Sequence, residues 1–351
     1  MNRNHPMGFS YLEQRYPTLA RRIARLPLGD FPTPLQRLGH TEQKLWVKRD
    51  DQTHSVYGGN KIRKLEYLLA RAREQHCKQV VTFGGVGSNH ALATAIHARA
   101  NDLGCVSLLL PQRMTDYVQG TLVRHQANHS ELRATPMRRA NRLRLMRELR
   151  DRNDRRLAVV PMGGTSPRGS IGYVNAAFEL AAQWHGSQPP QRIYVAAGTM
   201  GTVAGLAVGL SLLGWPTTIM AVRVVVASQC NDIAMQRLCE KTSLLLNRYD
   251  SRIPRIDDAA ARITIRGEYL GADYADTTQA SCDAVDEAIK RWSLPLETTY
   301  TGKAMACMLD DLQQTSQRGD WMFWHTYNGR AAGSQPIDLA SPYADFLSLC
   351  A

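Results

Sequence analysis

Predicted strands and helices alternate along most of this 351-residue chain. Short apolar runs predict strands, and the longer amphipathic stretches between them predict helices. The expected strands are 80–83, 106–110, 157–160, 193–196, 219–227 and 322–324, and the expected helices are 62–75, 89–101, 139–152, 171–184, 202–213, 279–292 and 303–314. Because a helix is the usual crossover between neighbouring parallel strands, the sequence predicts an α/β fold. Its sheets should be mostly parallel and twisted, with helices on both faces.

Two of the predicted strands run into glycine-rich turns that open a helix. These turns are Gly84 to His90 and Gly198 to Gly205. The free amides of a first helical turn, together with the helix dipole, bind anions. The second turn lacks the G-x-G-x-x-G spacing of a dinucleotide site, and the strand predicted after it has no acidic residue at its end to hold a ribose. Since no basic residue lies between Thr199 and Leu213, a phosphate is expected to bind there through backbone amides.

A lysine stands directly after two glycines and an asparagine, in the sequence Gly58-Gly59-Asn60-Lys61. A predicted amphipathic helix follows at once. Paired glycines allow a sharp turn and a close approach of the backbone to a ligand. An amine presented at such a helix start can form a Schiff base with an aldehyde. The same pattern also fits a solvated lysine in a glycine-rich turn.

Several segments together carry a family resemblance. They are Leu26–Gly29, Pro32–Leu35, Leu45–Asp51, Gly58–Glu66, Ser88–His90, Gly198–Thr202, Tyr300–Met305 and His325–Thr326. In order and spacing they resemble the family of D-cysteine desulfhydrase and 1-aminocyclopropane-1-carboxylate deaminase, pyridoxal-phosphate enzymes of the tryptophan-synthase-β fold type (fold type II). The resemblance implies a large cofactor-binding domain formed by residues 1–61 and 166–351, with a smaller α/β domain of residues 62–165 inserted into it.

The resemblance also implies pyridoxal 5'-phosphate as the cofactor and the residues that would bind it. Lys61 would bind its aldehyde carbon, and Asn89 would lie beside its phenolic oxygen. Its phosphate would bind to Gly198, Thr199, Met200, Gly201 and Thr202. Thr301 stands where ring-opening deaminases carry a carboxylate, which keeps the pyridine nitrogen protonated. We therefore expect Thr301 to leave this nitrogen unprotonated, which favours loss of a β-substituent over opening of a cyclopropane.

The same resemblance implies two further sets of site residues. Those expected to take part in catalysis are Lys61, Ser88, Tyr274 and Tyr300. Those expected to bind the substrate are Ser88, Asn89, His90, Thr326 and Tyr327. Ser88 is equally well placed to cap the helix that follows it, and each tyrosine also fits a half-buried aromatic with a hydrogen-bonded hydroxyl.

Three positions depart from the family pattern. Tyr327-Asn328 replaces a pair of glycines, Gly87 stands where a glutamine commonly precedes the serine, and Ala275 replaces a glycine. These positions are implied to lie near the substrate rather than near the phosphate. They therefore bear on whether D-cysteine is the substrate and not on the choice of cofactor.

Composition excludes several other classes of protein. The net charge of +12 owes much to the nine arginines of residues 138–156, but this segment has no aromatic residue for base stacking, and a solvated helix face explains it. No run of about 18 apolar residues predicts a membrane span, and the first residues have no apolar signal region. Seven cysteines without a C-x-x-C pair fit a reducing cytosol and predict no metal site.

From these observations we expect a cytoplasmic homodimer that acts on a small amino acid and binds neither nucleic acid nor a membrane. The expected activity is that of a pyridoxal-phosphate lyase or deaminase, which eliminates a β-substituent and gives a keto acid and ammonia. A β-replacement synthase or an amino-acid racemase on the same fold is the alternative. A non-catalytic protein that binds the cofactor or nucleic acid is an alternative of another class.

Overall fold

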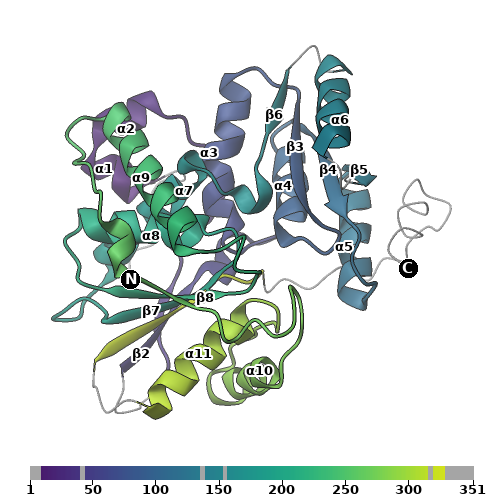
Figure 1. Ribbon diagram of the computed structural model, residues 1–351. Helices are drawn as coiled ribbons and strands as arrows, with labels where there is room; N and C mark the ends of the chain where they lie inside the picture. The colour runs from purple at the N-terminus through teal and green to yellow at the C-terminus, as the bar shows by residue number, and fades with distance from the viewer. Residues whose placement is uncertain (1–8, 40–43, 135–138, 153–155, 315–318, 329–351) are drawn as a thin grey trace. The chain divides into compact units, whose positions relative to one another are not determined.

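The computed structural model describes residues 9–39, 44–134, 139–152, 156–314 and 319–328 (Figure 1). Its strands are β1 (Leu35–Arg37), β2 (Lys44–Arg49), β3 (Gln79–Gly85), β4 (Gly104–Leu110), β5 (Glu131–Ala134), β6 (Leu157–Val159), β7 (Arg192–Ala197), β8 (Thr218–Arg223), β9 (Ile263–Arg266) and β10 (Asp320–His325). Its α-helices are α1 (Tyr11–Arg15), α2 (Pro17–Arg22), α3 (Lys61–Glu74), α4 (Asn89–Arg99), α5 (Asp116–Ala127), α6 (Arg139–Arg152), α7 (Pro167–Gln183), α8 (Gly201–Leu212), α9 (Asp232–Tyr249), α10 (Gln279–Trp292) and α11 (Thr301–Gln314). Three short 3-10 helices are η1 (Asp50–Gln52), η2 (Met162–Gly164) and η3 (Ala259–Arg262).

The described residues group into two compact units. The large unit comprises those within 1–23, 27–64 and 165–329, and the small unit comprises those within 24–26 and 65–164. The chain passes from one unit to the other within α3 and again directly after η2. Each unit contains its own sheet.

The sheet of the large unit has six strands in the order β1-β2-β10-β7-β8-β9. Only β1 is antiparallel to its neighbour. At the centre, Phe323 of β10 lies between Val47 of β2 and Tyr194 of β7, and all three side chains are fully buried. Strands buried on both faces are typical of parallel sheets covered by helices.

This topology brings three chain segments to one edge of the large sheet. Strands β2, β10 and β7 are parallel neighbours, so their carboxyl ends lie side by side. The segment after β2 leads to the Gly58–Lys61 turn, the segment after β10 begins at Thr326, and the segment after β7 is the Gly198–Thr202 loop. Ligands of open α/β sheets bind at this edge.

The sheet of the small unit has four parallel strands in the order β5-β4-β3-β6. Helices α4, α5 and α6 lie alongside these strands in Figure 1. Because β3 and β4 are parallel neighbours in full register from Gln79–Gly104 to Gly85–Leu110, the turn after β3 and the segment after β4 share the carboxyl edge of this sheet.

The α/β fold class with mostly parallel sheets is confirmed, and one predicted element was too long. The strand expected over 219–227 ends at Arg223, and the apolar residues Val224 and Val225 continue into the core outside the sheet. Within the described residues, no helix has the length and apolar character needed to cross a bilayer. The same residues include no cluster of three or more histidine, cysteine and carboxylate side chains that could bind a metal ion.

Candidate functional site

The turn that carries Lys61 is held tightly by backbone contacts. Gly59 adopts a left-handed conformation with φ of 91°, and a Cβ at this position would lie 3.0 Å from the carbonyl oxygen of Thr326. Both features require glycine. The amide of Asn60 donates to this Thr326 oxygen at 3.1 Å. The turn is thereby fixed against the segment that follows β10.

Lys61 is the first residue of α3 and is linked to the loop after β7. Its Nζ donates to Oδ1 of Asn60 at 2.9 Å, and Nδ2 of Asn60 donates to Oγ1 of Thr202 at 3.1 Å. The sequence placed Asn60 in the motif but did not predict this bridge. It orients the Lys61 amine through a neutral side chain that is itself bound to the second glycine-rich loop.

Part of the Lys61 amine is in its neutral, nucleophilic form near neutral pH. Burial lowers its pKa from 10.5 to about 8, although the nearby Glu297 carboxylate opposes this shift. A pKa of 8 leaves roughly a quarter of the amine neutral at pH 7.5, whereas an ordinary lysine would have about 0.1% in this form. The neutral form is the nucleophile that attacks a carbonyl group.

The two glycine-rich turns differ in how their helices begin. In the small unit, the Ser88 hydroxyl accepts a hydrogen bond from the amide of Ala91 at 3.3 Å and caps α4. In the large unit, α8 follows Met200, which has a left-handed φ of 67° and provides no side-chain cap. The 12-residue helix α8 therefore presents first-turn amides to a ligand. Of the two turns, the 198–202 loop is the better match to a phosphate site.

A second lysine lies beside this loop. A Cβ on Gly201 would come 3.4 Å from Nζ of Lys64, which is buried. Burial, and then the charge of Lys61, lower the pKa of Lys64 well below its ordinary value. A buried amine at the start of an uncapped helix fits a doubly charged phosphate, so Lys64 joins the backbone amides as a candidate phosphate-binding group. Three-residue spacing places Lys61 and Lys64 on one face of α3, and this spacing was the available signal.

Thr165 also holds this loop in place. Its hydroxyl donates to the Thr199 hydroxyl at 2.7 Å and accepts a hydrogen bond from the Gly201 amide at 3.3 Å. The Gly201 amide also approaches the Thr199 carbonyl oxygen at 3.0 Å. The residues expected to bind phosphate are thus held in a fixed shape, but the Gly201 amide already has partners within the protein.

Thr301 is joined to a carboxylate that the sequence analysis overlooked. Its hydroxyl donates to Oε1 of Glu297 at 2.9 Å and accepts from the Glu297 amide at 3.0 Å. The same carboxylate accepts from the amides of Thr299, Tyr300 and Thr301 at 2.7–3.1 Å. Burial raises the pKa of Glu297, although these hydrogen bonds oppose the shift. A carboxyl group therefore lies directly beside Thr301, although the threonine itself has none.

The two candidate tyrosines are in contact. The hydroxyls of Tyr274 and Tyr300 are hydrogen-bonded, and the rings meet edge to face with centroids 6.1 Å apart. A Cβ on Gly198 would lie 3.9 Å from the Tyr300 ring, so this pair adjoins the phosphate loop. Burial raises the pKa of Tyr274, and the bond from Tyr300 opposes this shift. Ala275, which replaces the family glycine, has a left-handed φ of 64°.

The segment after β10 explains one departure from the family pattern. Oδ1 of Asn328 accepts a hydrogen bond from the amide of Gly58 at 2.8 Å. Thr326 contacts the lysine turn through its backbone oxygen, as described above, and its side chain is buried. Asn328 therefore stabilises the turn that presents Lys61, which is a structural role that a glycine would leave unfilled.

The small unit contains the remaining candidates, Ser88, Asn89 and His90. His90 is buried, and its Nε2 accepts a hydrogen bond from the Gly164 amide at 3.0 Å. This bond fixes the tautomer that carries its proton on Nδ1. Oδ1 of Asn89 accepts from the Tyr117 hydroxyl at 2.7 Å. All the other candidate residues, including Tyr327, belong to the large unit.

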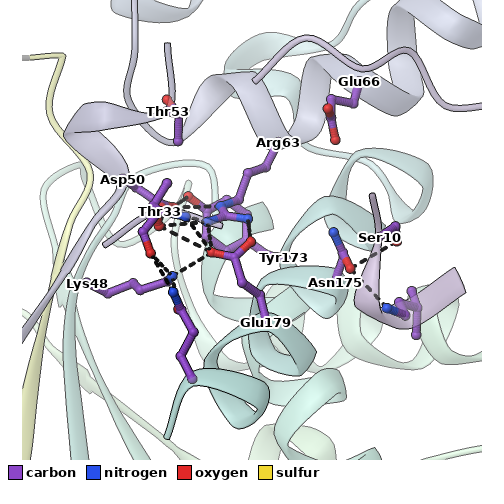
Figure 2. Close-up of polar contacts among 12 residues, drawn as sticks. Ser10, Thr33, Lys48, Asp50, Thr53, Arg63, Glu66, Tyr173, Asn175 and Glu179 are labelled. Atoms are coloured by element: carbon purple, nitrogen blue, oxygen red, sulfur yellow. Dashed lines mark hydrogen bonds and ion pairs between the residues drawn. The ribbon is translucent and has the colours of Figure 1, made fainter. Parts of the chain in front are cut away.

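A buried ionic cluster lies next to the start of α3 (Figure 2). Arg63 forms ion pairs with Asp50 at 2.7 Å and with Glu179 at 2.9 Å, and Lys48 pairs with Glu179 at 2.5 Å. The four side chains are at most 1% exposed, and their formal charges cancel. Figure 2 shows Thr33 and Tyr173 among them. Since Arg63 is two residues from Lys61, the cluster anchors the first turn of α3.

Comparisons with known proteins identify the family of this chain. The family model of pyridoxal-phosphate dependent enzymes matches residues 26–326. D-cysteine desulfhydrase of Klebsiella pneumoniae (strain 342) is 32% identical over 322 residues, which cover 87% of this chain and 94% of that protein. D-cysteine desulfhydrase of Yersinia enterocolitica is 32% identical over 326 residues, covering 88% and 96%. The crystal structure of an ACC deaminase homologue superposes with a TM-score of 0.77 at 28% identity, covering 94% of this chain and 98% of that one.

Proposed function

This chain belongs to the family of pyridoxal-phosphate dependent enzymes, and we propose that it is a lyase that removes a β-substituent from a small amino acid. The products would be the released substituent, a keto acid and ammonia. The names of the relatives that are 32% identical, both D-cysteine desulfhydrases, support this reaction class. The absence of a carboxylate at position 301 itself also supports it.

The observation that carries the proposal is the bridge from the Lys61 amine through Asn60 to Thr202 at the start of α8. It couples a candidate Schiff-base lysine to an uncapped helix in the same unit. The donors present there fit the cofactor: Lys61 would hold its aldehyde carbon, and Lys64 with backbone amides of the 198–202 loop other than that of Gly201 would hold its phosphate. When bound, pyridoxal phosphate withdraws electrons from the α-carbon of the attached amino acid.

The residues of this chain would then handle the protons. Once the substrate's amino group has displaced Lys61 from the aldehyde carbon, the freed Lys61 amine, whose pKa is about 8, can accept the proton from the α-carbon at neutral pH. The raised pKa of Tyr274 keeps its hydroxyl protonated. The Tyr274–Tyr300 pair can therefore donate a proton to a departing β-substituent such as a thiolate.

A second candidate function rests on Glu297. Its carboxylate is hydrogen-bonded to the Thr301 hydroxyl, so a negative charge stands behind the position where ring-opening deaminases carry theirs. Such a charge favours a protonated pyridine nitrogen. A 1-aminocyclopropane-1-carboxylate deaminase is therefore the alternative, and Glu297 is the residue on which the choice depends.

The test measures keto-acid release by the purified protein loaded with cofactor. D-cysteine, L-cysteine, β-chloro-D-alanine and 1-aminocyclopropane-1-carboxylate are compared for the wild type, Thr301→Glu and Glu297→Gln. The proposal expects turnover of a β-substituted amino acid to exceed ring opening in the wild type, and Thr301→Glu to shift the ratio toward ring opening. Faster ring opening by the wild type that is lost in Glu297→Gln would instead establish the deaminase.

A further inference from the structure

The tyrosine pair of the large unit joins a surface loop to the start of a helix. Tyr274 lies in the loop 267–278, between β9 and α10, and Tyr300 directly precedes α11. Their hydroxyls are hydrogen-bonded to each other. Residues 271–273 are exposed, so this part of the loop buries little apolar surface that could hold it in place. The position of the Tyr274 hydroxyl therefore depends on polar contacts between the loop and the rest of the large unit.

Lys303 makes such a contact. It is the third residue of α11, and its Nζ donates to the Leu270 carbonyl oxygen at 2.5 Å. The Tyr300 carbonyl oxygen accepts from the Ala304 amide at 3.2 Å, so Tyr300 and Lys303 belong to the same helical turn and lie three residues apart on one side of it. This turn contacts the loop at two points, Leu270 and Tyr274.

The part of the loop that carries Tyr274 is closed by hydrogen bonds of its own. Oδ2 of Asp276 accepts from the Ala272 amide at 2.8 Å, and the Asp276 amide donates to the Asp273 carbonyl oxygen at 3.1 Å. Because these internal contacts give the loop a defined shape, a contact that holds Leu270 also limits where Tyr274 can lie, four residues later.

The amine of Lys303 is placed there although its surroundings oppose a charge. Lys303 is buried, and burial lowers its pKa, although the carboxylates of Asp276 and Glu297 oppose this shift. A cation in the first turn of a helix also faces the positive end of the helix dipole. A methionine would fill a similar volume without a charge to desolvate. Packing alone therefore does not require a lysine at this position, whereas the contact with Leu270 does require a donor.

We propose that Lys303 is a positioning residue of the reaction and acts through Tyr274. It fixes the loop so that the Tyr274 hydroxyl stays beside Tyr300 and can protonate the departing substituent. A thiol leaves when its sulfur takes the electron pair of the Cβ–S bond and the hydroxyl proton, and the phenol then regains a proton from solvent. Chloride leaves as a stable anion and needs no proton. The inference rests on the proposed function, because Tyr274 has this task only if a β-substituent is eliminated.

The first test measures amide hydrogen exchange of the peptide that covers residues 270–276, in the protein loaded with pyridoxal phosphate. Wild type and Lys303→Met are compared, with Lys290→Met as the control, since Lys290 is exposed on α10. Loss of a hydrogen bond from a charged group should speed exchange of this peptide about tenfold in Lys303→Met, and Lys290→Met should leave it unchanged. Unchanged exchange in Lys303→Met would overturn the inference, whatever the activity of the protein.

The second test compares kcat/KM for cysteine and for β-chloroalanine, each as the enantiomer that the wild type turns over. Lys303→Met should lower the value for cysteine about tenfold and that for β-chloroalanine less than about twofold. It should add no further loss for cysteine in a Tyr274→Phe background. Lys303→Gln keeps a shorter NH2 donor and should show smaller changes in the same order, and it takes the place of Lys303→Met if that variant does not fold.

The outcomes separate positioning from a merely structural effect. An equal fall for both substrates, or a further loss in the double variant, would overturn the inference while leaving the proposed function in place. A wild type that turns over neither amino acid would overturn the proposed function and, with it, the role of Lys303 in the reaction. Faster exchange in Lys303→Met would then still show that Lys303 holds the loop.

Discussion

Replacing Glu179 by glutamine should destabilise the large unit by about 3 kcal/mol at neutral pH. Glu179 is the common partner of Arg63 and Lys48 in the buried ionic cluster. The substitution keeps the size of the side chain and removes one of two negative charges. Two buried cations then share a single carboxylate, Asp50, and breaking a buried ion pair in this way costs 3–5 kcal/mol.

The pKa of Glu179 gives the magnitude independently. Burial alone would raise this pKa, but Arg63 and Lys48 outweigh it and lower the pKa from 4.5 to about 2. Such a lowering, at 1.36 kcal/mol per pKa unit, corresponds to about 3 kcal/mol. Because the folded-state pKa is lowered, this stabilisation is fully present above pH 4.5 and is lost as the pH falls toward 2.

Tryptophan fluorescence measures the unfolding of the large unit. All six tryptophans lie in the large unit, and Nε1 of Trp324 donates to Oδ2 of Asp50 inside the cluster at 2.8 Å. With a guanidinium slope of about 5 kcal/mol/M for a unit of this size, Glu179→Gln should lower the unfolding midpoint by about 0.6 M at pH 7. The gap between variant and wild type should shrink below pH 4.5.

The control is Glu287→Gln, which breaks the exposed ion pair with Arg291 on α10 in the same unit. Its effect should stay below about 0.5 kcal/mol. If Glu179→Gln shifts the midpoint no more than this control, or if its deficit persists unchanged at pH 3, the ionic cluster does not stabilise the large unit as described.

Three further predictions address other parts of the chain. Ala275→Gly should stabilise the large unit by about 0.5–1 kcal/mol, because it relieves a left-handed φ of 64°. The control Ala280→Gly in α10 should destabilise this unit, and a change of the same sign for both variants in guanidinium unfolding would contradict the backbone argument. Lys64→Met should weaken pyridoxal-phosphate binding at least about tenfold, whereas Lys241→Met, which changes an exposed lysine, should not. Equal affinities of Lys64→Met and the wild type in equilibrium dialysis would exclude Lys64 from the phosphate site. Burial lowers the pKa of His125 from 6.5 to about 3, so the folded small unit resists protonation of this side chain. Its free energy of unfolding should therefore fall by about 2 kcal/mol between pH 7 and pH 5. Hydrogen exchange in α5 should show this loss of stability in the wild type and a smaller loss in His125→Leu.

The sequence predicted those elements whose pattern is local. Helices over 139–152 and 279–292 were predicted with the observed bounds, because periodicity is carried by the segment itself. Helix α9 was missed although its buried residues Met235, Leu238, Thr242 and Leu246 recur at helical spacing. Strand β2 was missed for a different reason. A lysine such as Lys48 is normally a surface residue. Its burial here depends mainly on distant partners, Glu179 and Gln183, which lie 131 and 135 positions further along the chain.

The same distinction applies to the candidate site. The Lys61 turn and the 198–202 loop were recognisable because glycines, strand ends and helix starts are sequence signals. The contact that gives these motifs their chemistry joins two distant positions, Asn60 and Thr202. Glu297 is close to Thr301 in sequence, but its role depends on a side chain that folds back over the first amides of α11. Residue types alone do not specify such contacts.

The central claim is that Lys61 binds the cofactor, and covalent mapping tests it most directly. The holoenzyme is reduced with borohydride, digested and analysed by mass spectrometry, with Lys61→Ala treated in parallel. The account predicts one pyridoxyl group on the peptide that contains Lys61, and none in the variant. A label on Lys64, or on Lys303, whose Nζ here donates to the Leu270 carbonyl oxygen at 2.5 Å, would contradict it.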